Sequence, residues 1–351
     1  MWVVKVFIMN NKKVTAIVYA VLAAVFYAIS MPFSKLLLTK IEPTFMASFL
    51  YFGAGIGIGV IYFLGKNRRK TTEEKLSRKD LPFTIGMIVL DIAAPIFLMM
   101  GLLSATSANA SLLNNFEIVA TSIIALFVFK EVITPRLWAA ILLITLSSML
   151  LSFENVSSLQ FSYGSIFILA AAVCWGLENN FTRKISSKST FQIVIIKGIF
   201  SGTGSLLVAL IQGEYFPPLL YAAYAMLLGF VAYGLSIFLY VKAQKELGAA
   251  KTSAYYAIAP FVGALLSFVI LRESITEYYL FALSIMLVGS ALVVVDTMIT
   301  NHSHLHSHSF AHSHDGIMHS HVTEHSHTHK HFTLNNKHFH QHKYDGKKKN
   351  S

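Results

Sequence analysis

The sequence of 351 residues contains few charges and a single cysteine. Charged residues make up 13% of the chain and hydrophobic residues 55%, with a mean hydropathy of +0.59. Soluble globular domains carry about 25% charged residues, so this composition excludes an ordinary soluble domain. The lone Cys174 excludes an intrachain disulfide and suggests no redox chemistry. No phosphate-binding glycine loop or catalytic triad spacing is visible, so we expect neither an enzyme nor an ATP-driven pump.

Long apolar runs make up most of the chain. A helix that crosses a bilayer core needs about 20 apolar residues. Ten stretches approach that length, near residues 14–36, 43–64, 82–103, 107–129, 136–153, 162–182, 191–211, 219–241, 249–271 and 277–298. They are continuous, whereas membrane β-barrels show short alternating segments. The predicted fold class is therefore an all-α membrane protein with ten transmembrane helices.

Parts of the sequence occur twice. Residues 103–134 resemble residues 244–276, and each copy ends in a basic residue and a glutamate, Lys130-Glu131 and Arg272-Glu273. We expect an N-terminal stub (1–13), two repeats of five helices (14–153 and 161–298) and a tail (299–351). Because five is odd, the second repeat would be inverted in the membrane relative to the first, which is typical of transporters.

Lysine and arginine concentrate on one side of the predicted spans, for example in the loop 66–79. Cytoplasmic flanks carry such an excess, so we expect a multi-pass protein of the cell membrane with both termini in the cytoplasm. The net charge of +11 is then a consequence of topology, and we expect no nucleic-acid partner.

Small residues recur at helical spacing in the second span of each repeat. They are Gly53, Gly55, Gly57 and Gly59 in the first repeat, and Gly198, Ser201, Gly202 and Ser205 in the second. Such faces let helices approach closely. We expect packing within the chain, with a homodimer contact as the alternative.

The repeats resemble the EamA family of the drug/metabolite transporter superfamily over residues 14–298. The resemblance rests on the two five-helix halves, Trp175-Gly176, the run 247–250 (LGAA), Pro260 and Arg272-Glu273. It implies transport of small organic solutes such as amino acids and metabolites, by proton coupling or exchange. It also implies a cavity lined mainly by the first four helices of each half. The first half departs from the pattern, because Ile118, preceded by Glu117, stands where the second half has Pro260.

Three acidic residues lie inside predicted spans: Asp91, Glu117 and Glu178. A charge at the bilayer centre costs at least about 2.5–3.5 kcal/mol, so such residues are functional by default. We expect a site that binds a cationic or zwitterionic solute, or protons exchanged with it. Its candidate residues are Asp91, Asn114, Asn115, Glu117, Trp175, Glu178, Asn179 and Tyr256.

A structural alternative assigns these acids to helix packing, with Glu178 paired to Arg183. We expect Lys197, a base inside a span, to extend to the membrane interface. The cavity would then be acidic, which argues against phosphorylated sugars as substrates.

The tail has a different composition, and all 15 histidines of the chain lie between His302 and His342. Few apolar residues occur there, so we expect disorder. Repeated His-x-His units predict loose binding of Zn²⁺, Ni²⁺ or Cu²⁺, with no cofactor required for function. The candidate ligands are His302, His304, His306, His308, His312, His314, His319, His321, His325, His327, His329 and His331.

Three functions remain open. The first is a secondary transporter in the lipid bilayer, an exporter of small organic solutes such as amino acids, amines or metabolites. The second is a divalent-metal transporter or a metal-responsive membrane protein that uses the tail, although no histidine lies in a predicted span. The third is a membrane sensor or scaffold, which would not need a duplicated polar interior.

Overall fold

The computed structural model describes residues 2–65, 74–130, 133–155, 160–247, 252, 255–314 and 317–332. The chain divides into two compact units, Met1–Asp296 and Thr297–Ser351.

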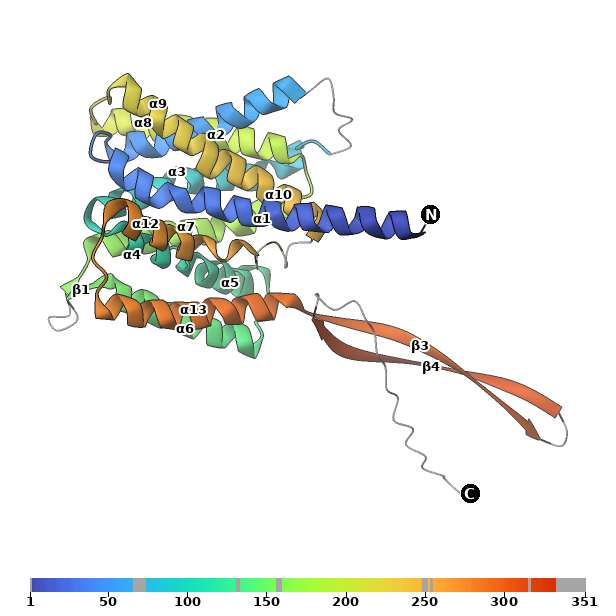
Figure 1. Ribbon diagram of the computed structural model, residues 1–351. Coiled ribbons are helices and arrows are strands. Elements are labelled where there is room, and N and C mark those ends of the chain that lie inside the picture. Colours follow the sequence, from blue (N-terminus) through green and yellow to red (C-terminus); the bar gives the residue numbers. More distant parts are fainter. Residues whose placement is uncertain are drawn as a thin grey trace. The chain divides into compact units, whose positions relative to one another are not determined.

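The first unit is a bundle of helices that run side by side (Figure 1). Its elements are α1 (Trp2–Leu37), α2 (Pro43–Gly65), η2 (Arg78–Asp80), α3 (Leu81–Ser104), α4 (Ser107–Leu113), α5 (Phe116–Phe129), α6 (Pro135–Ser152), β1 (Phe153–Asn155), β2 (Gln160–Phe161), α7 (Tyr163–Ile185), α8 (Thr190–Gln212), α9 (Leu219–Gly229), the π-helical segment η3 (Phe230–Leu235), α10 (Ser236–Leu247), α12 (Ala259–Leu271) and α13 (Glu277–Met298).

Among the described residues, eight helical stretches are long and apolar enough to cross a membrane. They cover 14–37, 43–65, 78–104, 107–128, 135–152, 190–212, 219–243 and 277–296. The expected count of ten is not confirmed. Helix α7 occupies the place of the expected span 162–182 but carries Glu178, Arg183 and Lys184, which lower its hydropathy. Helix α12 is apolar but has 13 residues, and most of 248–254 lies outside the described part of the chain.

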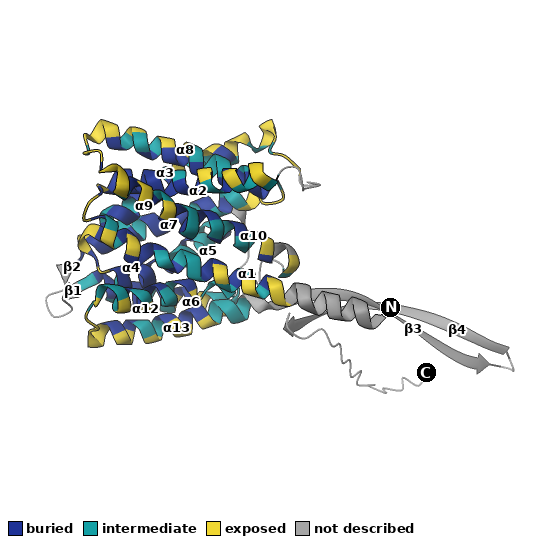
Figure 2. Cartoon of the chain, turned by 45° about the horizontal axis from the view of Figure 1, so that its top comes forward, coloured by how far each residue is buried: buried dark blue, intermediate teal, exposed yellow. Residues whose placement is uncertain are grey.

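The bundle buries its interior and leaves apolar side chains on its outside. Figure 2 shows buried positions gathered between the helices and exposed positions along the outer helices and the ends. Large exposed apolar side chains include Phe63, Leu210 and Val269, at 70%, 58% and 68% exposure. An exterior of this kind matches lipid, because acyl chains are as apolar as these side chains.

The packing follows the duplication. Helix α2 packs on α8, its counterpart in the second half. Helix α3, from the third span of the first half, packs on α7, the first helix of the second half. In the same way α10, from the third span of the second half, packs on α1, the first helix of the first half. The pair α5 and α7 likewise matches the pair α12 and α1. Each half therefore completes its core against the other half.

Glycines bring α2 and α8 together, as expected from the small-residue faces. A Cβ atom on Gly198 would lie 2.4 Å from the Cα atom of Gly55. Glycine also lets α2 approach α9, because a Cβ atom on Gly53 would lie 1.9 Å from the carbonyl oxygen of Met226 in α9. The backbones therefore touch at positions where any side chain would force the helices apart.

The repeated basic-acidic motif ends one helix and caps another. Lys130 and Arg272 follow α5 and α12 in the left-handed conformation, with φ values of 58° and 52°. The carboxylate of Glu273 then accepts hydrogen bonds from the backbone N–H groups of Ser107 (2.7 Å) and Ala108 (2.9 Å), at the start of α4. A carboxylate is favourable there because unpaired N–H groups and the helix dipole make a helix N-terminus positive. Its counterpart Glu131 lies outside the described residues.

A second glutamate caps α2 in the same way. The Glu214 carboxylate accepts hydrogen bonds from the N–H groups of Thr44 (3.0 Å) and Phe45 (2.9 Å). Both capping glutamates belong to the second half of the chain, and both capped helices belong to the first half. The caps therefore also join the halves.

The helical bundle agrees with the expected all-α class, whereas the second unit forms a hairpin in place of the expected disordered tail. Strands β3 (Ile299–His314) and β4 (Ile317–Phe332) pair as an antiparallel hairpin. The physical reason lies in the local sequence. Asp315-Gly316 separates the strands, and this dipeptide is typical of two-residue hairpin turns between segments that alternate with period two.

Replacing Gly198 with alanine should destabilise the bundle by about 1–3 kcal/mol, because the new methyl group would overlap the backbone of Gly55. Gly59→Ala is the matched control, since a Cβ atom there would meet nothing within 4 Å. The control should be neutral or more stable, because alanine favours helix over glycine. Thermal unfolding in detergent, followed by circular dichroism, measures both. Equal stability of the two variants would contradict the close contact.

Replacing Glu273 with glutamine should lower the free energy of unfolding by about 1–2 kcal/mol, because the cap loses its charge. Glu277→Gln is the control, since Glu277 is exposed in the first turn of α13. Its loss should cost less than about 1 kcal/mol. Denaturation in mixed micelles measures the free energy of unfolding of both variants. An equal loss in both would mean that the Glu273 hydrogen bonds add nothing to the favourable interaction of a carboxylate with a helix dipole.

Candidate functional site

Three charged side chains from three helices meet inside the bundle. The Lys197 ammonium (α8) lies 3.1 Å from Asp91 Oδ2 (α3) and 3.0 Å from Glu178 Oε1 (α7). The side chains of Asp91 and Glu178 are 0% and 3% exposed, and that of Lys197 is 13% exposed. We call these three residues the ion cluster. Burial of one charge with two opposite charges is tolerated because each finds partners in the protein.

Hydroxyl groups complete the ion cluster. The Tyr51 hydroxyl donates a hydrogen bond of 2.8 Å to Asp91 Oδ1, and the Thr182 hydroxyl donates to Glu178 Oε1. Trp175 is also buried at this position and contacts the Tyr51 hydroxyl. The polar atoms of the cluster therefore have defined orientations.

The position of Lys197 corrects the expectation that it extends to the membrane interface. Its helix packs on α3, and the Lys197 side chain reaches Asp91 of α3 and Glu178 of α7 inside the bundle. The electrostatic attraction between the ammonium and the two buried carboxylates is stronger than it would be in water, because the interior has a lower dielectric constant. Glu178, for which Arg183 was the alternative partner, has Lys197 as its ion-pair partner.

Glu117 lies just after an interruption of its span. Helix α4 ends at Leu113 and α5 begins at Phe116, with Asn114 and Asn115 between them. Here backbone hydrogen bonds join residues three apart, instead of four apart as in an α-helix: from Asn115 N to Leu112 O (3.0 Å) and from Glu117 N to Asn114 O (3.1 Å). A tightened turn inside a helix often marks a functional hinge. Broken spans are also where transporters place binding sites.

An amide holds the Glu117 side chain. Asn179 Nδ2 (α7) donates a hydrogen bond of 2.5 Å to Glu117 Oε1. The next residue, Asn180, donates to the Thr121 carbonyl of α5 (3.2 Å) and to the Gly176 carbonyl (2.8 Å). Glu178 and Asn179 are neighbours, so α7 links the ion cluster to Glu117. Unlike the acids of the ion cluster, Glu117 forms no ion pair with a basic side chain among the described residues.

Tyrosine rings connect the two polar regions. The Tyr51 ring lies 5.6 Å from Tyr233, and Tyr233 lies 5.9 Å from Tyr27, between ring centroids. Tyr27 in turn lies 6.0 Å from Tyr256. Tyr233 belongs to the π-helical segment η3, a feature that is frequent at functional sites. Its hydroxyl group is buried without a hydrogen-bond partner among the described residues.

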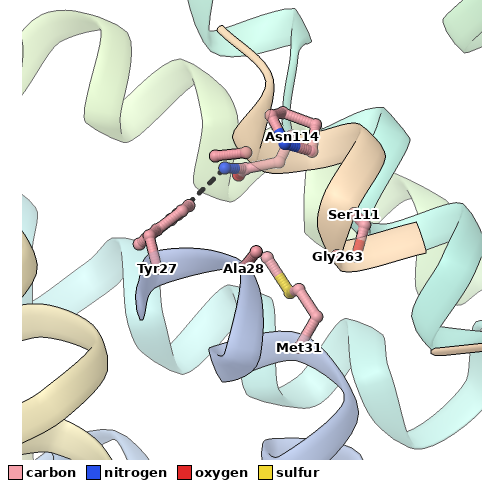
Figure 3. A pocket seen from close by; sticks show the side chains of 8 residues that line it. Tyr27, Ala28, Met31, Ser111, Asn114 and Gly263 are labelled. Carbon is pink, nitrogen blue, oxygen red and sulfur yellow. Dashed lines mark hydrogen bonds between the residues drawn. The ribbon is translucent and has the colours of Figure 1, made fainter. Parts of the chain in front are cut away.

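A small pocket lies beside the interruption of the span (Figure 3). Its walls come from α1, from α4 with Asn114, and from α12; the lining residues are Tyr27, Ala28, Met31, Ser111, Asn114, Ala259, Pro260 and Gly263. Asn114 Nδ2 donates a hydrogen bond of 2.9 Å to the Tyr27 hydroxyl. Within the described part of the chain, Ser111 Oγ and Asn114 Oδ1 are buried without partners. These two oxygens could accept hydrogen bonds from a solute or from water.

The structure gathers most of the candidate residues predicted from sequence. Asp91 and Glu178 belong to the ion cluster, and Trp175 lies beside it. Glu117 and Asn179 are hydrogen-bonded to each other. Asn114 and Tyr256 both contact Tyr27. Asn115 is also buried, and its amide nitrogen has no partner among the described residues.

Sequence reasoning missed Lys197 as a partner and did not single out Tyr27, Tyr51 or Tyr233. One signal could have identified Lys197. It was the only base well inside a predicted span, while three acids needed compensation. Nothing in the sequence alone distinguishes the three tyrosines from other aromatic residues of the spans.

The described side chains contain no group of three residues of the types that commonly bind metals. The tail histidines are not among these side chains.

Replacing Lys197 with methionine should destabilise the protein by about 3–5 kcal/mol, because two carboxylates would lose their buried counter-charge. Adding Asp91→Asn and Glu178→Gln to this variant should restore much of the stability, since no unpaired charge would remain. Denaturant titration in mixed micelles measures the three proteins. A single variant as stable as the unmodified chain, or a triple variant less stable than the single one, would contradict the ion cluster.

Comparisons with known proteins agree with this architecture. A relative in Methanothermobacter thermautotrophicus, named an uncharacterized transporter, is 27% identical over 271 residues, which cover 72% of this chain and 78% of the relative. A solved crystal structure, titled only as that of a protein, has a TM-score of 0.55 and 17% identity, and the match covers 80% of this chain and 95% of that one. At 17% identity, the match to the solved structure shows a similar fold and nothing more.

The sequence pattern of the EamA-like transporter family matches the chain twice, at residues 14–153 and 162–295. The two matches cover both halves of the helical bundle. Together with the apolar helices, they show that this multi-pass membrane protein belongs to the EamA-like transporter family.

Proposed function

We propose that the chain is a secondary transporter that exports small organic solutes carrying an amino group, in exchange for protons. In this proposal the two halves are inverted in the membrane, with both termini in the cytoplasm. The five spans predicted for each half, an odd number, and the excess of basic residues on one side of the predicted spans support this topology.

The observation that carries the proposal is the surroundings of Glu117. Lys197 is engaged by Asp91 and Glu178, whereas Glu117 is hydrogen-bonded by the neutral Asn179 amide. A negative site held by a neutral group can attract a cationic amino group or a proton. An acid at this depth in a span is a functional candidate by default.

The pocket supports a solute that also has hydrogen-bond donors. The Glu117 N–H group donates a hydrogen bond of 3.1 Å to the Asn114 carbonyl across the interruption, so the two residues lie close together. Asn114 is in turn hydrogen-bonded to the Tyr27 hydroxyl, and the Tyr27 ring lies 6.0 Å from the Tyr256 ring. An ammonium group at Glu117 could thus place its remaining N–H groups near Asn114 Oδ1 and Ser111 Oγ, which lack partners among the described residues.

Proton exchange follows from the same placement. A low dielectric constant favours the neutral form of a carboxyl group, so a carboxyl group in the bundle can hold a proton when no cation is bound. Binding of a cationic solute would displace that proton. Loading of one and release of the other are then coupled at a single group.

Glu117→Gln should abolish solute-driven proton movement, because glutamine cannot exchange a proton. A lost contact to a charged group is worth about 1.5–3 kcal/mol, so solute affinity should fall roughly tenfold to a hundredfold. Proteoliposomes with a pH-sensitive dye inside, challenged with mixed amino acids and amines, measure the proton flux. Counterflow of a radiolabelled solute measures binding and translocation separately.

Glu277→Gln provides a control with the same chemical change at an exposed site. It should transport like the unmodified protein. Proton-coupled transport by Glu117→Gln at a normal rate would refute the proton role of this residue. A response to Zn²⁺ or Ni²⁺ and to no organic solute would instead identify the protein as a metal transporter.

A further inference from the structure

The tail hairpin places histidines opposite one another. The register pairs His302 with His329, His304 with His327, His306 with His325, and His312 with His319. Residues directly opposite in an antiparallel pair lie on the same face of the sheet. Alternate residues along one strand also share a face.

As a result, all twelve histidines of β3 and β4 belong to one face of the hairpin. The opposite face carries none of them; its rungs include Asn301 with Lys330, Ser303 with Thr328, and Ser307 with Glu324. The alternation in the sequence places the histidines of each strand on one side of that strand. Only the register brings the two sets to the same face, because a slip of one residue would send them to opposite faces.

Three successive rungs form what we call the histidine ladder: His302 with His329, His304 with His327, and His306 with His325. In general, Cβ atoms across a rung lie about 4.5–5.5 Å apart, and rungs on one face follow at about 6.8 Å along the strands. Four histidine positions on two adjacent rungs thus form a small rectangle. This spacing suits one tetrahedral ion with metal-to-nitrogen distances of about 2.0–2.1 Å.

We propose that the histidine ladder is a binding site for a borderline divalent metal ion of the class of Zn²⁺, Ni²⁺ and Cu²⁺. Neutral imidazole is a preferred ligand of these ions. Ions held between rungs connect β3 to β4. Because an isolated two-stranded hairpin is only marginally stable in water, this connection also stabilises the hairpin. The proposal does not depend on what the helical bundle transports.

The test uses the full-length protein in detergent and Zn²⁺ in competition with a chromophoric chelator. The first variant, His304→Ala with His327→Ala, removes the central rung and leaves no two adjacent rungs in the ladder. The control, His308→Ala with His321→Ala, also removes one histidine from each strand. Its positions pair with Thr323 and Phe310, so the ladder stays complete.

The first variant should bind Zn²⁺ at least about tenfold more weakly than the unmodified chain, since even changes outside the ligand shell cost about 10–100-fold. The control should keep the affinity within about twofold. Binding of Zn²⁺ should also slow proteolysis within residues 299–332 in the control and not in the first variant. Equal loss of affinity in both variants would overturn the ladder and indicate an unordered histidine tract. An unmodified chain that binds no Zn²⁺ would overturn the site altogether.

Discussion

The structure depends on one constraint: charges inside an apolar bundle must find their partners within the protein. Asp91, Glu178 and Lys197 satisfy this constraint across α3, α7 and α8, with Tyr51 and Thr182 as hydrogen-bond donors. The contact requires the helices to pack at a fixed depth relative to one another, because a displaced helix would leave a charge unpaired. The ion cluster therefore specifies helix register as well as local chemistry.

Close approach of the helices is the second requirement, and small residues and caps supply it. The backbone contact between Gly55 and Gly198 joins the equivalent helices α2 and α8 of the two halves. Glu214 and Glu273 then link loops of the second half to helix N-termini of the first half. Arg272-Glu273, the second copy of the repeated basic-acidic motif, thus links the two halves through Glu273.

The two halves share a scaffold but differ in their polar content. Glu117 of the first half corresponds to Ala259 of the second half, and Asn114 corresponds to Tyr256, at the offset of the repeated motif. The pocket lies between these two dissimilar segments, where the span that contains Asn114 is interrupted. Because Ala259 stands at the position equivalent to Glu117, the two halves differ in charge here, and the proposed site is asymmetric. Such asymmetry suits a solute that has a cationic end.

Several features of this protein were determined by the sequence itself. Long apolar runs require helices, because lipid offers backbone groups no hydrogen bonds. The repeat Lys130-Glu131 and Arg272-Glu273 revealed two halves, and the rarity of acids in spans singled out Asp91, Glu117 and Glu178. Only the tertiary structure decided that Lys197 pairs with two of these acids, that Tyr27, Tyr51 and Tyr233 connect them to the pocket, and that the histidines of both tail strands share one face. The reason is physical: helix and strand periods are local, whereas the partner of a buried charge and the register of a strand depend on which distant segments pack together.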